Sequence, residues 1–101
     1  MGITSLKGKI AKNIWRTKES KGLPKDLWSR SRLLLEIMNA SARLENLKLQ
    51  GSPPDVRLHK LSENWKGHWS ITIQKTSGWR IVFKFAGGEF NDVEIIDYHG
   101  G

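Results

Sequence analysis

The 101-residue chain contains no cysteine, three prolines and a single tyrosine. The lack of cysteine excludes disulfides, thiolate metal sites and a cysteine nucleophile, and it is natural in a reducing compartment. The sequence also lacks a continuous apolar stretch of the length that a signal peptide or a membrane span requires, because its first ten residues mix lysines with scattered apolar residues. We therefore expect a cytoplasmic protein that does not insert into a membrane.

Positive charge, by contrast, is abundant. Seventeen Lys and Arg residues oppose ten Asp and Glu residues, which gives a formal net charge of +7. This balance favours a polyanionic partner through counterion release and electrostatic steering. Charge alone leaves open nucleic acid, an acidic protein, an anionic membrane surface and a basic surface that serves only solubility. A chain of this length can form one compact core, so we expect a single domain over residues 1–101 with its site on an open face.

The hydrophobic pattern changes from helical spacing to strand-like alternation near the middle of the chain. In the first half, Ile10 and Ile14 fall on one face of an expected helix over Lys9–Glu19. A second helix is expected from Pro24 to about Ala40, where leucines, an isoleucine and a methionine form an apolar stripe. A cluster of glycine, serine and proline at positions 51–54 ends the helical part.

Alternation in the second half predicts four strands joined by short turns: Val56–Leu61, Gly67–Ile73, Trp79–Phe85 and Asp92–Tyr98. Short connections favour hairpins in an antiparallel meander. The predicted fold class is therefore α+β, with two N-terminal helices packed on one face of a four-stranded antiparallel sheet. The period of two assigns nine residues to the helix-covered face: Val56, Leu58, Trp69, Ile71, Ile73, Trp79, Ile81, Phe83 and Phe85.

The same period places chemically useful side chains on the other face, which we expect to be uncovered. They are Arg57, His59, His68, Ser70, Thr72, Arg80, Lys84 and Tyr98. Guanidinium, imidazole and aromatic groups together provide phosphate neutralisation, proton transfer and base stacking, which metal-free RNA cleavage requires. A solvated sheet face also carries polar side chains without any function, so the pattern leaves both interpretations open.

The C-terminal run Glu94–His99 contains the most informative local motif, Asp97-Tyr98-His99. The ending resembles that of HigB and the related GraT toxins, which are members of the RelE/ParE superfamily. Further matches occur in the family's order and nearly at its spacing: Ser52-Pro53-Pro54, Arg57-Leu58, Leu61, Gly67, Ser70-Ile71 and Trp79-Arg80. The motifs cover the C-terminal half, and the order of helices and strands extends the resemblance to the rest.

The resemblance implies a RelE-like microbial ribonuclease fold and the toxin component of a type II toxin-antitoxin system. Such a toxin cleaves messenger RNA in the ribosomal decoding site by general acid and base catalysis, with no metal and no other cofactor. The implied partners are messenger RNA on the ribosome and a HigA-like antitoxin with a helix-turn-helix. Operator DNA would be reached only through the antitoxin.

The resemblance also implies roles for individual residues. Arg80 follows the family's strand tryptophan and is expected to brace the scissile phosphate with a planar guanidinium. The other implied catalytic residues are Asp97, Tyr98, His99 and His59. We expect further RNA contacts from Arg57, Lys60, Lys66, His68 and Lys84.

One departure concerns position 62, where this chain has serine and HigB has a catalytic lysine. Either Lys60 or Lys66 could supply the missing charge, since each flanks the gap with a long side chain. If neither does so, the protein could be a weak nuclease or only a binding module for RNA or the ribosome. A gyrase poison of the ParE type is a further alternative. Three tryptophans could anchor a partner or could simply belong to the core and its rim: Trp15, Trp28 and Trp65.

Overall fold

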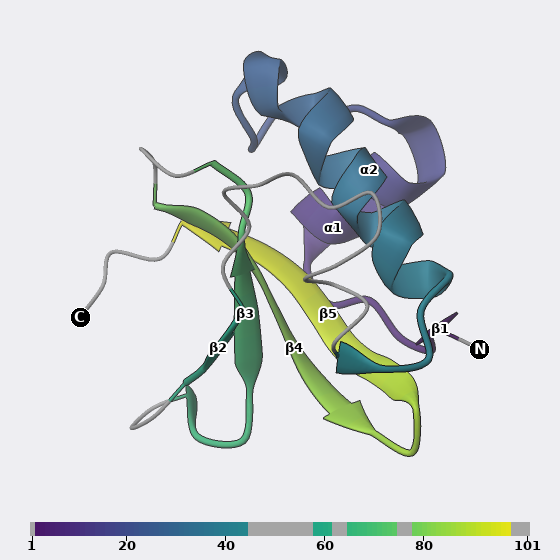
Figure 1. Cartoon of the computed structure of the whole chain (residues 1–101). Coiled ribbons are helices and arrows are strands. Elements are labelled where there is room, and N and C mark those ends of the chain that lie inside the picture. Colours follow the sequence, from purple (N-terminus) through teal and green to yellow (C-terminus); the bar gives the residue numbers. More distant parts are fainter. Residues whose placement is uncertain (1, 45–57, 62–64, 75–77, 98–101) are drawn as a thin grey trace.

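The computed structural model describes residues 2–44, 58–61, 65–74 and 78–97. Its elements, in chain order, are β1 (Gly2–Ile3), α1 (Lys9–Thr17), the 3₁₀ helix η1 (Lys25–Leu27), α2 (Trp28–Asn39), β2 (His59–Lys60), β3 (Trp69–Thr72), β4 (Trp79–Ala86) and β5 (Glu89–Asp97). Helices come first and most strands follow, and the two α-helices lie together on one side of the sheet (Figure 1). This arrangement confirms the predicted α+β class.

The sheet has five strands in the order β1-β5-β4-β3-β2, not four. Strands β2 to β5 form the expected antiparallel meander, whereas β1 pairs with β5 in the parallel direction. The predicted all-antiparallel, four-stranded sheet was therefore wrong at one edge. The reason is that β1 has only two residues and no alternation of its own, and it is defined by a partner almost 90 residues away in the sequence.

Contacts between the N-terminal segment and β5 continue beyond β1. The amides of Thr4 and Lys7 each donate to a β5 carbonyl at 2.8 Å, and the amide of Val93 donates to the carbonyl of Ser5 at 3.0 Å. Gly2 has a φ of 71°, and a Cβ at this position would collide with the backbone of Asn39. A glycine is therefore required where the edge strand passes the end of α2.

Helix α1 covers the predicted range except its last two residues. It ends at Thr17 because Lys18 adopts the left-handed conformation and its amide bonds back to the carbonyl of Ile14. The second predicted helix begins as η1 after Pro24 and continues as α2 to Asn39. Within the described ranges, neither helix is long and apolar enough to cross a membrane.

Arg32 of α2 joins the two helices. Its Nη1 donates to the carbonyl of Trp15 at 2.5 Å, and its guanidinium lies 4.6 Å from the centre of the Trp15 ring. Its Nε forms an ion pair with Glu36 at 3.0 Å, one turn along α2. A cation at the C-terminal end of α1 also complements the helix dipole, so this side chain fixes α1 against α2.

The main core lies between the helices and the sheet. It contains Ala11 and Ile14 of α1, Leu34, Leu35 and Met38 of α2, and apolar residues of β3, β4 and β5. The described residues assigned to the helix-covered face by alternation all belong to this core or pack against it; Val56 lies outside the described residues. The sheet face directed away from the helices is therefore the face that carries the remaining side chains of β2 to β5.

Candidate active site

The sheet face directed away from the helices, here called the polar face, has its side chains in two rows that follow from the strand register. One row runs His59, Ser70, Val82 and Glu94 across β2, β3, β4 and β5. The adjacent row runs Thr72, Arg80 and Ile96 across β3, β4 and β5. Directly opposed residues in antiparallel strands lie on the same side, so each row forms one line of neighbouring side chains.

The centre of the polar face is closed to solvent, which contradicts the expectation of an uncovered surface. Ser70, Thr72 and Val82 are exposed by only 1%, 3% and 0%. Alternation predicts which face a side chain occupies but not what packs over that face, and this explains the error. The apolar Val82 and Ile96 at polar-face positions were the sequence signal that could have revealed it.

Arg80 lies between Thr72 and Ile96 in the second row, with its guanidinium directed towards β3. Its Nη1 donates to the Oγ1 of Thr72 at 2.5 Å, and the two residues are direct partners in the β3–β4 ladder. Arg80 is half-buried, so the hydrogen bond lies in a partly desolvated environment. A planar guanidinium oriented by a fixed hydroxyl is preorganised to donate to two oxygens of a phosphate.

His59 stands beside a buried hydroxyl. It pairs directly with Ser70 in the β2–β3 ladder, and His59 is exposed whereas Ser70 is buried. Among the described residues, the Oγ of Ser70 has no hydrogen-bond partner. Buried hydroxyls normally find a partner, so the Oγ of Ser70 is an exception to the general rule. Our reasoning from sequence had assigned no role to Ser70.

His59 and Arg80 lie near each other on the polar face. His59 and Arg80 are separated by one intervening strand and by two residues along it, so their Cα atoms are about 12 Å apart for standard sheet spacings. The Arg80 side chain extends towards Thr72 and thus shortens this gap.

Two further predicted RNA contacts lie at the end of the polar face. His68 packs edge-on against Trp65 with ring centres 5.1 Å apart, and its Nδ1 is buried without a partner among the described residues. Lys84 is exposed and lies 3.8 Å from the carboxylate of Asp92. Lys84 is four residues after Arg80 in β4 and therefore lies on the same side of the sheet, while His68 lies directly before β3.

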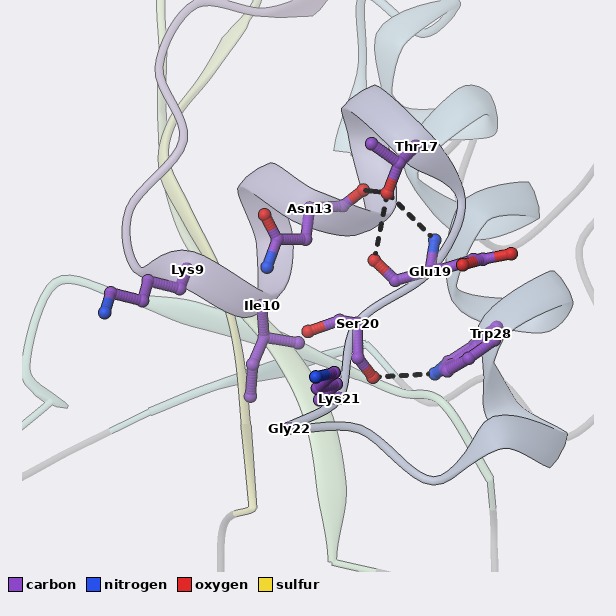
Figure 2. A pocket seen from close by; sticks show the side chains of 9 residues that line it. All are labelled: Lys9, Ile10, Asn13, Thr17, Glu19, Ser20, Lys21, Gly22 and Trp28. Atoms are coloured by element: carbon purple, nitrogen blue, oxygen red, sulfur yellow. Dashed lines mark hydrogen bonds between the residues drawn. The ribbon is translucent and has the colours of Figure 1, made fainter.

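A separate hollow of roughly 620 Å³ lies on the helical side of the molecule. Its lining includes Ile10 and Asn13 of α1, the loop at positions 19–22, and Trp28 of α2 (Figure 2). The Nε1 of Trp28 donates to the carbonyls of Ser20 and Leu23 at 2.9 and 2.8 Å and thereby fixes the loop. None of the predicted catalytic residues within the described ranges lines this hollow.

Comparisons with known proteins match nearly the whole chain. A family model described as the RelE-like toxin of the type II toxin-antitoxin system HigB matches residues 4–99. The chain belongs to the HigB toxin family. A relative from Proteus vulgaris with the name Endoribonuclease HigB is 29% identical over 97 residues, which cover 96% of this chain and 99% of the relative.

The HigB family's terminal motif is only partly within the described residues. Asp97 pairs with Trp79, so it lies on the helix-covered side of β4 and β5, opposite to the face of Arg80. The ladder is regular from Trp79 to Val82, and this places Asp97 and Arg80 on different faces at the end of β5. Tyr98, His99 and Arg57 lie outside the described residues.

The two lysines that could replace the HigB lysine differ in position. Lys60 pairs with Trp69, and its Nζ lies 5.9 Å from the centre of that ring, on the side opposite to His59 and Arg80. The structure therefore does not bring Lys60 to the polar face. Lys66 is exposed in the turn before β3 and remains the better candidate for this charge. Position 62 lies outside the described residues.

The remaining expectations concern tryptophans and metals. Trp15 lies beside Arg32, Trp28 is fixed by two carbonyls, and Trp65 packs on His68, so all three tryptophans are half-buried and have internal contacts. In the described part of the chain, no group of three or more His, Asp or Glu side chains is arranged to hold a metal ion.

Proposed function

We propose that this HigB-family toxin is an endoribonuclease that cleaves messenger RNA on the ribosome and thereby inhibits translation. The observation that carries the proposal is the placement of Arg80 with Thr72, and of His59 with Ser70, in adjacent rows of one sheet face. The name of the Proteus vulgaris relative supports the same reaction class.

The proposed reaction breaks the bond between phosphorus and the 5′-oxygen of the next nucleotide. The ribose 2′-oxygen attacks the phosphorus while a base removes its proton, and an acid gives a proton to the departing 5′-oxygen. The products are a 2′,3′-cyclic phosphate and a 5′-hydroxyl. Arg80 stabilises the charge that develops on the phosphate oxygens, and the scheme uses side chains alone.

Proton transfer in this scheme falls to imidazole groups. His59 is the described imidazole of the Arg80 face that is exposed to a substrate, and His99 of the terminal motif is the second candidate. Ser70 lies beside His59 in the β2–β3 ladder, but it is closed to solvent and takes no direct part in this scheme. Tyr98 would stack on a base or orient the nucleotide. Asp97 would act by positioning His99, since its own ladder position is on the opposite face.

The proposed partners follow from family membership. A type II toxin implies a cognate antitoxin, and we propose that it is a HigA-like helix-turn-helix protein that binds operator DNA while holding the toxin.

A translation assay with the purified toxin tests the proposal. A defined message is translated in vitro with and without the toxin, and the ends of the RNA are mapped. We expect cuts that follow the codon register and disappear when ribosomes are omitted or the antitoxin is added. Cuts without ribosomes would contradict ribosome dependence. An intact message would leave a binding module, or a gyrase poison if replication stalls instead.

A further inference from the structure

Trp65 differs from the other four tryptophans in its surroundings. Trp15, Trp28, Trp69 and Trp79 all pack against the hydrophobic core, whereas Trp65 does not belong to that set. The indole nitrogen of Trp65 has no hydrogen-bond partner among the described residues, whereas that of Trp28 donates to two carbonyls. Tryptophan is enriched at binding surfaces, because it combines a large apolar ring with one polar N–H group. The place of Trp65 outside the core therefore points to a surface contact.

The ring of Trp65 packs edge-on against His68, in the turn that leads into β3. The two ring centres are 5.1 Å apart, and the ring planes are inclined by 88°. The amide of His68 also donates to the carbonyl of Trp65 at 2.9 Å, so the backbone of the turn fixes the two rings relative to each other. The pair, here called the aromatic corner, presents two perpendicular planes, and a flat group that stacks on one ring directs its edge towards the other.

The turn that carries the aromatic corner is open to solvent. Lys66 and Gly67 are both exposed, and a Cβ added to Gly67 would meet no atom within 4 Å. Lys84 lies at the same end of the sheet, because His68 immediately precedes the β3 residue that pairs with Phe83, and Lys84 immediately follows Phe83. The aromatic corner is thus accompanied by two exposed cations, one in the turn and one on β4.

An aromatic surface beside cations is the combination that binds single-stranded nucleic acid. Every base offers a flat π face for stacking, and every phosphate offers a negative charge to a nearby lysine. The pair of Lys84 with Asp92 is half-exposed and therefore weak, so a phosphate can compete for this lysine. A protein partner matches the surface less well, because lysine is depleted in protein interfaces.

The aromatic corner adjoins the strand that also orients the candidate active site. His68 is four residues before Thr72, whose hydroxyl accepts a hydrogen bond from Arg80. Four residues of extended strand span about 13 Å, so the corner lies beyond the groups that would hold the scissile phosphate. From this arrangement we propose that Trp65 and His68 form a stacking site for one nucleobase of the message, in a nucleotide that flanks the cut. The identity of the RNA in this inference rests on the proposed function.

The test measures RNA binding and does not require cleavage. The probe is a fluorescein-labelled single-stranded RNA of mixed sequence in which every 2′-hydroxyl is methylated, so that it cannot be cut by attack of that group. A series of further probes lacks one base each, at successive positions. Fluorescence anisotropy gives the Kd of every probe for the wild-type toxin and for the variants Trp65→Leu and Trp65→Phe.

Leucine keeps apolar bulk but cannot stack, so we expect Trp65→Leu to bind the complete probe about 10-fold more weakly, whereas Trp65→Phe retains most of the affinity. In the wild type, removal of the base at one position should weaken binding by a similar factor. In Trp65→Leu, removal of the same base should have little further effect, and this coupling identifies a ring and a base that are in contact. The salt slope of log Kd should be unchanged in both variants, since no charge is removed.

Circular dichroism and thermal unfolding show whether the variants are folded, and His68→Leu, which removes the other ring, replaces Trp65→Leu if that variant is unfolded. Additive losses, equal affinities of the leucine and phenylalanine variants, or no binding of the complete probe by the wild type would overturn the inference. Retained RNA binding with lost antitoxin binding would also overturn it and assign the aromatic corner to a protein contact. Failure of the nuclease function would instead appear as an intact unmodified message while the coupling persists.

Discussion

The two sides of this molecule present cations in opposite ways. On the polar face, Arg80 is half-buried and bonded to Thr72, and Lys84 faces a carboxylate. On the outer surface of α1, the side chains of Lys9, Lys12 and Arg16 are exposed, and none of them has an ion-pair partner among the described residues. Residues 1–44 contain ten Lys and Arg residues against three Asp and Glu residues, whereas residues 45–101, which include Arg80 and Lys84, contain seven of each. Net charge alone therefore does not locate the candidate active site.

Removal of Arg80 should produce the largest effect on this comparison. We expect Arg80→Ala to reduce message cleavage by about 10²- to 10³-fold, the usual loss for a donor that stabilises transition-state charge. Arg80→Lys should recover only part of the rate, because an ammonium lacks the planar fork. Mapping of message ends under single-turnover conditions gives the rates. Wild-type cleavage by Arg80→Ala would remove the polar face from the mechanism.

Loss of Arg32 should weaken the packing of α1 against α2. We expect Arg32→Met to lower the free energy of unfolding by roughly 1.5–3 kcal/mol, since the variant loses a charged hydrogen bond to α1 and the contact with Trp15. Urea denaturation followed by tryptophan fluorescence measures the change. Ser29→Ala, a change at an exposed position of the same helix, is the control and should have little effect.

Thr72 tests whether the order of the polar face matters. Thr72→Val preserves the side-chain shape but removes the hydroxyl that accepts from Arg80, and we expect a loss of roughly tenfold in the cleavage rate with a smaller change in KM. Thr72→Ser keeps the hydroxyl and should rescue the rate. Equal rates in the Val and Ser variants would show that Thr72 only fills space.

The smallest effect is expected at Lys84. Its pair with Asp92 is half-exposed at 3.8 Å, so Lys84→Gln should change the stability by less than about 1 kcal/mol. The salt slope for RNA binding should fall by roughly 0.7, as for one phosphate contact. Urea denaturation and anisotropy titrations provide both values. If Lys84→Gln reduced the salt slope as much as the triple variant Lys9→Gln/Lys12→Gln/Arg16→Gln, the two sides of the molecule would contribute equally to RNA binding.

Much of the fold followed from hydrophobic periodicity because its strongest signals are local. The stripe of α2 and the alternation of β4 needed no knowledge of distant residues, and both elements appear where they were expected. Strand β1 could not be predicted in this way, because two residues have no measurable period and their pairing with β5 is entirely non-local.

The candidate site was predictable to the extent that alternation determines faces. Arg80 and His59 share a face as expected, and Lys60 falls on the other one because it is the neighbour of His59 in the strand. The burial of Ser70 and Thr72 was not predictable from alternation, because in the sequence both resemble ordinary solvent-exposed residues. The burial of the Ser70 hydroxyl depends on which side chains pack over the polar face, and that packing depends on the whole fold.

The parallel pairing of Ile3 with Phe90 has a consequence for synthesis. The edge strand cannot pair until its partner residues in β5, almost 90 residues later in the sequence, have been synthesised. A contact between residues so far apart in the sequence slows folding, because the entropy of closing the long loop must be paid before the strands pair. The β1–β5 edge of the sheet is therefore completed only after β2, β3 and β4 have been made.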